Sequence, residues 1–595
     1  MIGLTLQKVS RARSKRARLL ALFLTLSLIE GLFFQKELLI FGLALSVYIL
    51  VSYSHNWFNF LPKTSSAFGL TDILLWEMLL FSMLGILHPI KVQDGLIEAL
   101  RWGIFWLAYR LGGNVSSNQA ERVDLGQYIE SLAIAVAFIG WLPYVSKVAG
   151  RFSSVFGYPN ATAAFLGAVL LLNPHRKLVQ IILGIALLGT GSRAGVGLFL
   201  AVLMGRQILL GIPPSFGLWQ RFQARSLKGL GVTLLALGST ILMLHYNRPV
   251  WDNLTAAGFS SSSWQERLVY FKDGISLAWN ATGLPQAGGW MAFPTVQRIP
   301  YWTADPHSSF IHILLNQGIL GVLSVGIWSS YSLVQAGKYW IKSRVLKSRA
   351  DFEETKAQIR VWAALLYLGL HSLVDADFSF GALGFLFWML CGSIQKREEP
   401  LRPSLSWHKL AADLSSKGML VLSLSLCLFC GSALLYPNLL EKEQSWNRQA
   451  VQWRNQDPTK SNMLWARSLN WDQTQVGARR EQAELLLSGG NVDTGLRVVE
   501  EVILWQPLNL GAYEWAQSIV WDTAEIQRRM HPEKAMMLYS WVESVPRKIE
   551  DRAAILTPTD RLLWRGYQDF LPSQHIKLLS EYARQRQLPQ LLPRT

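Results

Sequence analysis

The stretch FIHILLNQGILGVLSVGIW, residues 310–328, is apolar enough to enter a bilayer. It follows the tetrapeptide DPHS, residues 305–308, with only Ser309 between them. Asp305 is a favourable N-cap and Pro306 a favourable first helical residue, so we expect one helix to begin here. His307 would then lie in the first turn, where the positive end of the helix dipole disfavours the imidazolium form and leaves the ring able to accept a proton. The alternative is an interfacial histidine with a satisfied hydrogen bond.

The composition around this stretch predicts an all-α, polytopic membrane protein. Half of the 595 residues are hydrophobic and only 16% are charged, and the apolar segments are long and repeated. The net charge of +17 needs no nucleic-acid partner, because Lys and Arg gather in short loops between apolar segments. The three cysteines, Cys391, Cys427 and Cys430, lie in or beside apolar segments, which favours neither a disulfide framework nor a metal site. We expect no cofactor.

Hydropathy predicts 12–13 transmembrane helices in residues 1–437. The expected spans are 19–34, 38–53, 68–87, 95–110, 127–145, 160–172, 178–190, 194–211, 229–245, 308–334, 359–374, 379–393 and 418–436. Loops between them are alternately rich and poor in Lys and Arg, which predicts a cytoplasmic N-terminus. The large loop 246–307 and the tail 438–595 are then extracytoplasmic.

The tail 438–595 is charged, rich in Gln and free of further spans. Trp471, Gly477 and Ala478 recur as Trp505, Gly511 and Ala512, an offset of 34 residues. That period is typical of tetratricopeptide-type helical hairpins, with an ordinary helical bundle as the alternative. We expect a helical domain that binds a partner, such as an envelope protein, rather than a catalytic one.

Four polar segments are expected on the outer face. They are 151–160, the small-residue segment GTGSRAG at 189–195 with Arg193, an amphipathic surface helix that carries Arg267, and HSLVDAD at 371–377. An arginine at the membrane boundary is costly unless paired or snorkelling, which makes it a functional candidate. Asp375-Ala-Asp377 has the spacing found in metal-dependent glycosyltransferases, although an acidic outer turn is the simpler interpretation. The predicted substrate contacts are Arg151, Tyr158, Asn160, Ser192, Trp264, Lys272, Arg298, Tyr301, Ser308, His371 and Asp375.

These residue types indicate a class of substrate. Planar guanidinium groups suit phosphate oxygens, aromatic faces suit sugar rings, and a groove at the membrane edge suits a lipid tail. The implied substrate is a lipid diphosphate that carries a glycan.

Across about residues 120–395 the chain resembles the O-antigen ligase and polysaccharide polymerase superfamily of bacterial membrane proteins. The most specific match is His307-Ser308 followed by Gly318-Ile-Leu-Gly321, and GYPNATAAFLGA, GTGSRAG, ERLVYFKDG and HSLVDADFSF follow the family order. The resemblance implies a metal-independent, inverting transfer of a glycan from undecaprenyl diphosphate to an acceptor hydroxyl on the outer face of the inner membrane. Arg193 and Arg267 would bind the diphosphate, and His307 would help activate the acceptor.

Two alternatives accompany this reading. Ligases often carry a polar residue at the position of Val322, and a minimal ligase lacks a tail like 438–595. Both features are more typical of a polymerase or a protein O-oligosaccharyltransferase of the same superfamily. The acceptor can therefore be a glycan, a lipid or a protein. A different class is a flippase for the lipid-linked glycan, or an envelope scaffold; a flippase should carry ionisable residues deep in several spans, whereas here the charges gather at one mouth.

Overall fold

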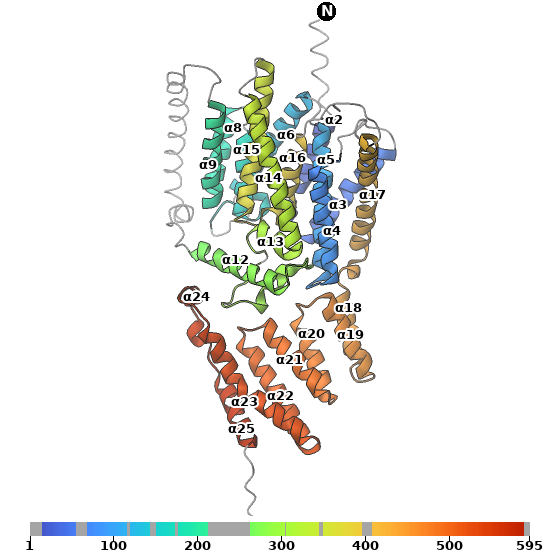
Figure 1. Ribbon diagram of the computed structural model, residues 1–595, viewed down its shortest axis with the longest axis vertical. Helices are drawn as coiled ribbons and strands as arrows, with labels where there is room; N and C mark the ends of the chain where they lie inside the picture. Colours follow the sequence, from blue (N-terminus) through green and yellow to red (C-terminus); the bar gives the residue numbers. More distant parts are fainter. Residues whose placement is uncertain are drawn as a thin grey trace, which may run out of the picture.

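A computed structural model describes residues 15–54, 68–115, 119–142, 150–172, 176–211, 262–303, 305–343, 349–394 and 407–587. Within these ranges the regular structure is helical, and an isolated bridge joins Lys91 to Asp472. The helices form an elongated bundle with a second helical layer at one end (Figure 1). The expected span 229–245 lies outside the described residues, as do the first residues of the loop 246–307.

The bundle contains the helices that were expected to cross the membrane. In chain order they are α2 (Lys15–Ser27), η1 (Ile29–Leu32), α3 (Gln35–Ser54), α4 (Leu70–Leu84), η2 (Gly85–Leu87), α5 (Val92–Val115), α6 (Gln119–Trp141), η3 (Ser154–Phe156), α7 (Pro159–Leu172), α8 (Lys177–Gly189), α9 (Arg193–Gly211), α13 (Ser309–Asn316), α14 (Gly318–Ser343), α15 (Arg349–Ser372), η6 (Asp377–Ser379), α16 (Gly381–Ser393) and α17 (Trp407–Leu435). Between α9 and α13 the chain forms α12 (Ser262–Asn280) and η5 (Gly289–Thr295).

Five of the described helical segments are long and apolar enough to cross a membrane: Gln35–Ser54, Leu70–Leu87, Glu121–Trp141, Gly318–Lys338 and Lys417–Leu435. Three shorter apolar helices, α7, α8 and α16, lie among them. This pattern is compatible with a multi-pass membrane protein. Only 6% of the residues in the most apolar part of α14 are buried inside the protein. The apolar side chains of this helix therefore face outward, and a lipid environment suits them.

Small residues hold the centre of the bundle together. α5 packs closely on α16, and neither Gly112 nor Gly392 has room for a side chain, because a Cβ there would meet the backbone of Met389 or Tyr109. Such close backbone approach is how helices associate in an apolar medium.

Paired charges are buried in the same bundle. Asp72 of α4 forms an ion pair of 2.7 Å with Arg110 of α5, and Glu98 pairs with Arg101. The expectation that charges gather only at one mouth was therefore incomplete. Both pairs are nearly inaccessible to solvent, as buried charges require partners to offset their desolvation.

The expected helix start at Asp305 was wrong. α13 begins at Ser309, and the N-cap is Ser308, whose Oγ accepts a hydrogen bond from the Ile311 amide. Asp305 and Pro306 lie outside the helix because the Asp305 carboxylate is bound by tertiary partners described below. His307 also precedes the helix, with a left-handed φ of 53°.

The apolar stretch is also two helices rather than one. α13 ends at Asn316, and α14 starts at Gly318, which has φ 71°. A Cβ at Gly318 would stand 2.5 Å from the Gly283 carbonyl oxygen, so the break depends on glycine. The Ile319 amide donates to that same carbonyl at 2.9 Å, which ties the start of α14 to the end of α12.

α12 crosses the end of the bundle as the expected amphipathic helix (Figure 1). Its buried side includes Tyr270, Asp273 and Leu277. Its opposite side exposes Leu268 and Trp279, with exposed fractions of 49% and 84%. An apolar outward stripe on a polar helix is typical of helices that lie in a membrane interface.

The C-terminal helices are α18 (Lys442–Trp453), α19 (Pro458–Trp471), α20 (Val476–Ser488), α21 (Val492–Trp505), α22 (Leu510–Met530), α23 (Pro532–Ala554), α24 (Pro558–Leu563) and α25 (Gln574–Gln587), with η7 (Pro437–Leu439) before them and η8 (Tyr567–Asp569) before α25. α18 packs on α19, α20 on α21 and α22 on α23. The first helices of these pairs begin at Lys442, Val476 and Leu510, 34 residues apart each time. The predicted period is therefore a period of helix pairs.

These helices dock against the end of the bundle that carries α12 (Figure 1). The Gln473 amide donates to the Ile90 carbonyl at 2.7 Å, and Trp505 packs into one apolar cluster with Ile90 and Phe293. Arg552 of α23 donates to the backbone carbonyl of Gln297. The docked layer thus supports the segment between α12 and α13.

Candidate functional site

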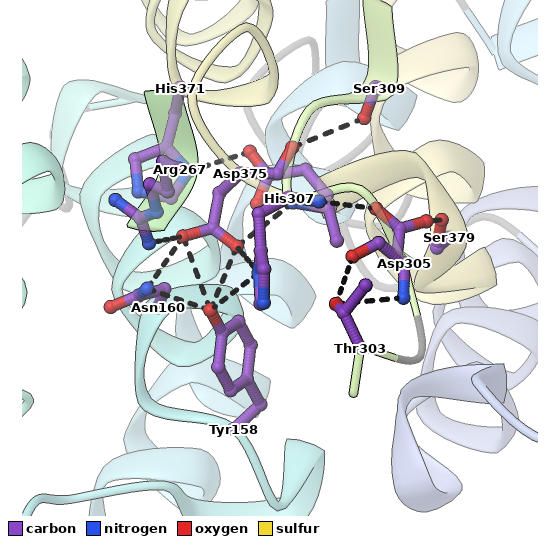
Figure 2. A network of polar contacts seen from close by, with 12 residues as sticks. Tyr158, Asn160, Arg267, Thr303, Asp305, His307, Ser309, His371, Asp375 and Ser379 are labelled. Carbon is purple, nitrogen blue, oxygen red and sulfur yellow. Dashed lines mark hydrogen bonds and ion pairs between the residues drawn. The ribbon is translucent and has the colours of Figure 1, made fainter. Parts of the chain in front are cut away.

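Asp375, in the turn between α15 and α16, is the centre of a polar network (Figure 2). Its side chain is fully buried. Arg267 Nη2 of α12 lies 2.9 Å from Oδ2, Asn160 Nδ2 of α7 donates to Oδ2 at 2.5 Å, and the Tyr158 hydroxyl donates to Oδ1 at 3.0 Å. One carboxylate therefore joins three of the four polar segments that were expected on the outer face.

The fourth segment joins through Arg151. Its Nη2 donates to Asn160 Oδ1 at 2.7 Å, and its Nε donates to the Thr190 carbonyl at 2.8 Å. This contact fixes the segment GTGSRAG, in which the Gly195 amide donates to Ser192 Oγ at 3.1 Å. Arg193, the first residue of α9, is half-buried beside this contact.

The guanidinium groups are close enough to influence one another. Burial lowers the pKa of Arg151, and the charges of Arg267 and Arg193 lower it further. Burial would lower the pKa of Arg267 too, but the Asp375 carboxylate raises it above its usual range. These guanidinium groups thus act on one another through charge, and such a cluster of cations suits a bound anion.

The same neighbours keep Asp375 ionised. Burial raises the pKa of this carboxyl group, but the adjoining His307 and the charge of Arg267 outweigh burial and hold the pKa below its ordinary value. Burial also raises the pKa of the Tyr158 hydroxyl well above its usual range. Tyr158 therefore acts as a hydrogen-bond donor to Asp375 and not as a base.

His307 lies at the edge of this network. Its Nδ1 is 3.9 Å from Asp375 Oδ1 and 3.5 Å from the Tyr158 hydroxyl, and its side chain is 30% exposed. The ring stacks on Tyr270 of α12 with centroids 5.7 Å apart. Nε2 has no hydrogen-bond partner among the described residues, so this nitrogen is available to a ligand.

Asp305 holds the His307 backbone in place. Its Oδ1 accepts a hydrogen bond of 3.0 Å from the His307 amide, and its Oδ2 accepts one from Ser379 (Figure 2). Oδ2 also lies 2.9 Å from His312 Nδ1. These contacts explain why Asp305 does not cap α13. They also fix an otherwise unfavourable left-handed residue, the kind of backbone strain that is found at functional sites.

A cavity of about 650 Å³ opens beside His307. Among the described residues, its lining comes from four parts of the chain: 30–34, 154–158, 302–303 with 305–307, and 376–380. The aromatic rings of its wall come from Phe33, Phe34, Phe156, Tyr158, Trp302 and Phe380. A cavity of this size with a few convergent polar groups is typical of a small-molecule site.

Other predicted contact residues lie in a separate cluster around Asp273. The Tyr301 hydroxyl donates to Asp273 Oδ2 at 2.8 Å. Arg298 and Lys272 act on Asp273 through charge, Arg298 half-buried and Lys272 exposed. None of the three is a hydrogen-bond or ion-pair partner of Asp375, so the structure does not join them to its network. Tyr301 still reaches the site indirectly, because its ring lies 4.6 Å from that of Tyr270.

The remaining predicted residues have local partners. Ser308 is the N-cap of α13, and Trp264 is half-buried near the start of α12. His371 is fully buried, with Nδ1 2.7 Å from Asp377 Oδ2. Asp375 and Asp377 thus bind different partners, and among the described residues no group of three His, Cys, Asp or Glu side chains could hold a metal ion.

Sequence reasoning missed Asp305 as a tertiary anchor, Tyr270 beneath His307, and Glu30 in the cavity. Tyr270 was within reach, because it lies three residues after Arg267 and shares its helix face. Glu30 gave no signal, since it stands alone in an apolar segment.

No protein-family model matches the chain, and no curated protein matches it significantly.

Proposed function

We propose that this chain is a bacterial membrane glycosyltransferase of the O-antigen ligase or polymerase type. It transfers a glycan from undecaprenyl diphosphate to an acceptor hydroxyl, with inversion and without a metal ion. One observation carries the proposal: a partly exposed histidine faces a cavity on one side and a buried Asp375–Arg267 ion pair on the other.

In the proposed step, His307 Nε2 accepts the proton of the acceptor hydroxyl, and that oxygen attacks the anomeric carbon of the glycan. The bond from this carbon to the diphosphate oxygen breaks, and its electron pair leaves with the diphosphate. The ionised Asp375, 3.9 Å from Nδ1, stabilises the imidazolium that forms. The proton then passes to water.

Arg267 and Arg193 bind the departing diphosphate. Negative charge grows on this group as the bond breaks, so fixed guanidinium groups stabilise the transition state more than the ground state. Asp375 orients Arg267 by an ion pair of 2.9 Å and leaves the other guanidinium nitrogens to the phosphate oxygens.

We assign the site to the outer face of the cytoplasmic membrane. The alternating basic loops support this orientation, and the exposed apolar stripe of α12 fits a helix that lies at the membrane surface where a lipid-linked donor is held. The C-terminal domain adjoins α12, so it belongs to the same side. Its helix pairs of 34-residue period support a tetratricopeptide-like domain that binds an envelope protein.

The acceptor decides between ligase, polymerase and protein O-oligosaccharyltransferase. A flippase is a weaker candidate, because the buried charges of α4 and α5 are paired with each other instead of lining a path.

Purified protein in lipid nanodiscs, incubated with a lipid-linked glycan and candidate acceptors, tests the proposal. We expect release of undecaprenyl diphosphate together with a glycosylated acceptor, and much slower formation of both products with His307→Ala. Movement of the donor across vesicle membranes without release of the diphosphate would instead establish a transporter.

A further inference from the structure

The cavity beside His307 has a charge opposite to that of the arginine side of the site. The described residues of its lining include two carboxylates, Glu30 and Asp305, and no Lys or Arg. Asp305 is 3% exposed and is fully engaged by His312, Ser379 and the His307 amide. Glu30 is exposed, and its carboxylate has no hydrogen bond or ion pair with the described residues. Glu30 is thus the carboxylate that a ligand in the cavity can reach.

The backbone around Glu30 is shaped to keep it there. Glu30, Gly31 and Leu32 are all left-handed, with φ of 48°, 65° and 53°. Leu32 is 1% exposed, and a Cβ at Gly31 would stand 2.7 Å from Phe156 and 2.9 Å from Phe380. Because both rings belong to the cavity wall, the turn is pressed against that wall and cannot relax into a regular helix without losing the contact.

We propose that Glu30 determines which acceptor the cavity binds: a neutral or amino sugar whose hydroxyl or ammonium group donates to the Glu30 carboxylate. This inference rests on the proposed function. Aromatic rings bind the C–H face of a sugar, and a carboxylate accepts hydrogen bonds from its hydroxyl groups. An acidic sugar is disfavoured, because its carboxylate or phosphate would face the negative charge of the Glu30 carboxylate.

The two sides of His307 therefore separate the substrates by charge. The anionic diphosphate binds on the side of Arg151, Arg193 and Arg267, and the acceptor enters between His307 and Glu30. Such an arrangement rejects a wrong partner by repulsion as well as by the loss of contacts.

Glu30→Gln in the full chain is the first test, because it removes the charge and keeps the shape. With a neutral or amino sugar acceptor, we expect the acceptor KM to rise about tenfold, as for loss of a charge-assisted hydrogen bond, while the donor KM stays unchanged. Glu30→Lys should shift the preference from a neutral acceptor to a matched uronic acid acceptor. Glu550→Gln, at an exposed position of α23, is the control and should change neither value.

The outcomes separate the two proposals. If wild-type protein neither releases the lipid diphosphate nor transfers the glycan, the proposed function fails. If wild-type protein transfers the glycan and well-folded Glu30 variants keep the acceptor KM and the charge preference, the assignment of Glu30 is overturned. The assignment would also be overturned if the cavity binds a lipid acyl chain instead of a sugar. In that case Phe34→Ala should weaken lipid binding, and Glu30→Gln should leave lipid binding unchanged.

Discussion

Two histidine–aspartate pairs meet at the turn between α15 and α16, because Asp375 and Asp377 are two residues apart, and the pairs differ in distance and exposure. His371 Nδ1 is 2.7 Å from Asp377 Oδ2, with both side chains buried, whereas His307 Nδ1 is 3.9 Å from Asp375 Oδ1 and 30% exposed. The close pair is closed to ligands on every side. The looser pair borders a cavity, so only the looser pair is able to exchange a proton with a substrate.

The surrounding elements explain the difference. His371 is near the end of α15, with its ring 5.9 Å from Tyr367, whose hydroxyl donates to the Ala163 carbonyl at 3.0 Å. That packing joins α15 to α7 in the interior of the bundle. His307 instead has a left-handed backbone and lies outside the helices. Its ring contacts Tyr158 and Tyr270, and one face of the ring is left uncovered.

The largest expected effect comes from the looser pair, His307 and Asp375. His307→Ala should lower turnover by about 10²–10⁴, the usual contribution of a general base, while donor binding and folding persist. The measurement is transfer per folded molecule with donor in excess. Wild-type turnover in this variant would leave positioning by the arginines as the whole mechanism.

The next effect concerns the partner of Asp375. Arg267→Ala should lower turnover by about 10²–10³, as for loss of one transition-state donor, and Arg267→Lys should restore little, because an ammonium group cannot replace the planar fork. Initial rates at limiting donor are the readout.

A buried Asp375 without Arg267 also threatens folding, so a double variant serves as control. Arg267→Ala with Asp375→Asn removes the unpaired charge and should recover the thermal midpoint without recovering turnover. Recovery of turnover in the double variant would mean that Arg267 serves only to neutralise Asp375.

The close pair, His371 and Asp377, should respond in the opposite way. His371→Ala leaves the buried Asp377 without its partner, which costs about 3–5 kcal/mol of stability. We expect less folded protein and a lower thermal midpoint but nearly normal turnover per folded molecule. His371→Ala with Asp377→Asn should restore stability; a large loss of turnover in that folded double variant would place His371 in the chemistry.

The contrast between the pairs also marks what the sequence could predict. Hydropathy and periodicity located the helices of the bundle, the 34-residue period and the surface helix of Arg267, because each depends on local pattern. The helix start was misjudged because the Asp305 side chain binds Ser379 and His312, and no local rule favours such distant partners over a cap. The break at Gly318 and the place of Glu30 likewise depend on close packing between segments far apart in sequence.

A third carboxylate, that of Asp273, extends the comparison and gives the smallest expected effect. Asp273, on the buried side of α12, has no cation within ion-pair distance among the described residues. Burial raises its pKa to about 6, against the lowering effect of the hydrogen bond from Tyr301. Below about pH 4 the carboxyl group is protonated in both folded and unfolded chains. Between about pH 4 and 6 the unfolded chain releases the proton and the folded protein retains it, so stability falls as pH rises through this window and stays low above it.

Asp273→Asn removes this titration and keeps an acceptor for the Tyr301 hydroxyl. Since a tenfold change in an ionisation equilibrium equals about 1.4 kcal/mol, the variant should gain at most about 3 kcal/mol over the wild type near pH 8 and lose that advantage near pH 4. Thermal midpoints of both proteins across this range are the measurement, with Asp551→Asn, at an exposed position of α23, as control. If the thermal midpoints of variant and wild type differ by the same amount at every pH, Asp273 is ionised in the folded protein at no cost in stability. Burial alone would then not distinguish Asp273 from the arginine-bound Asp375.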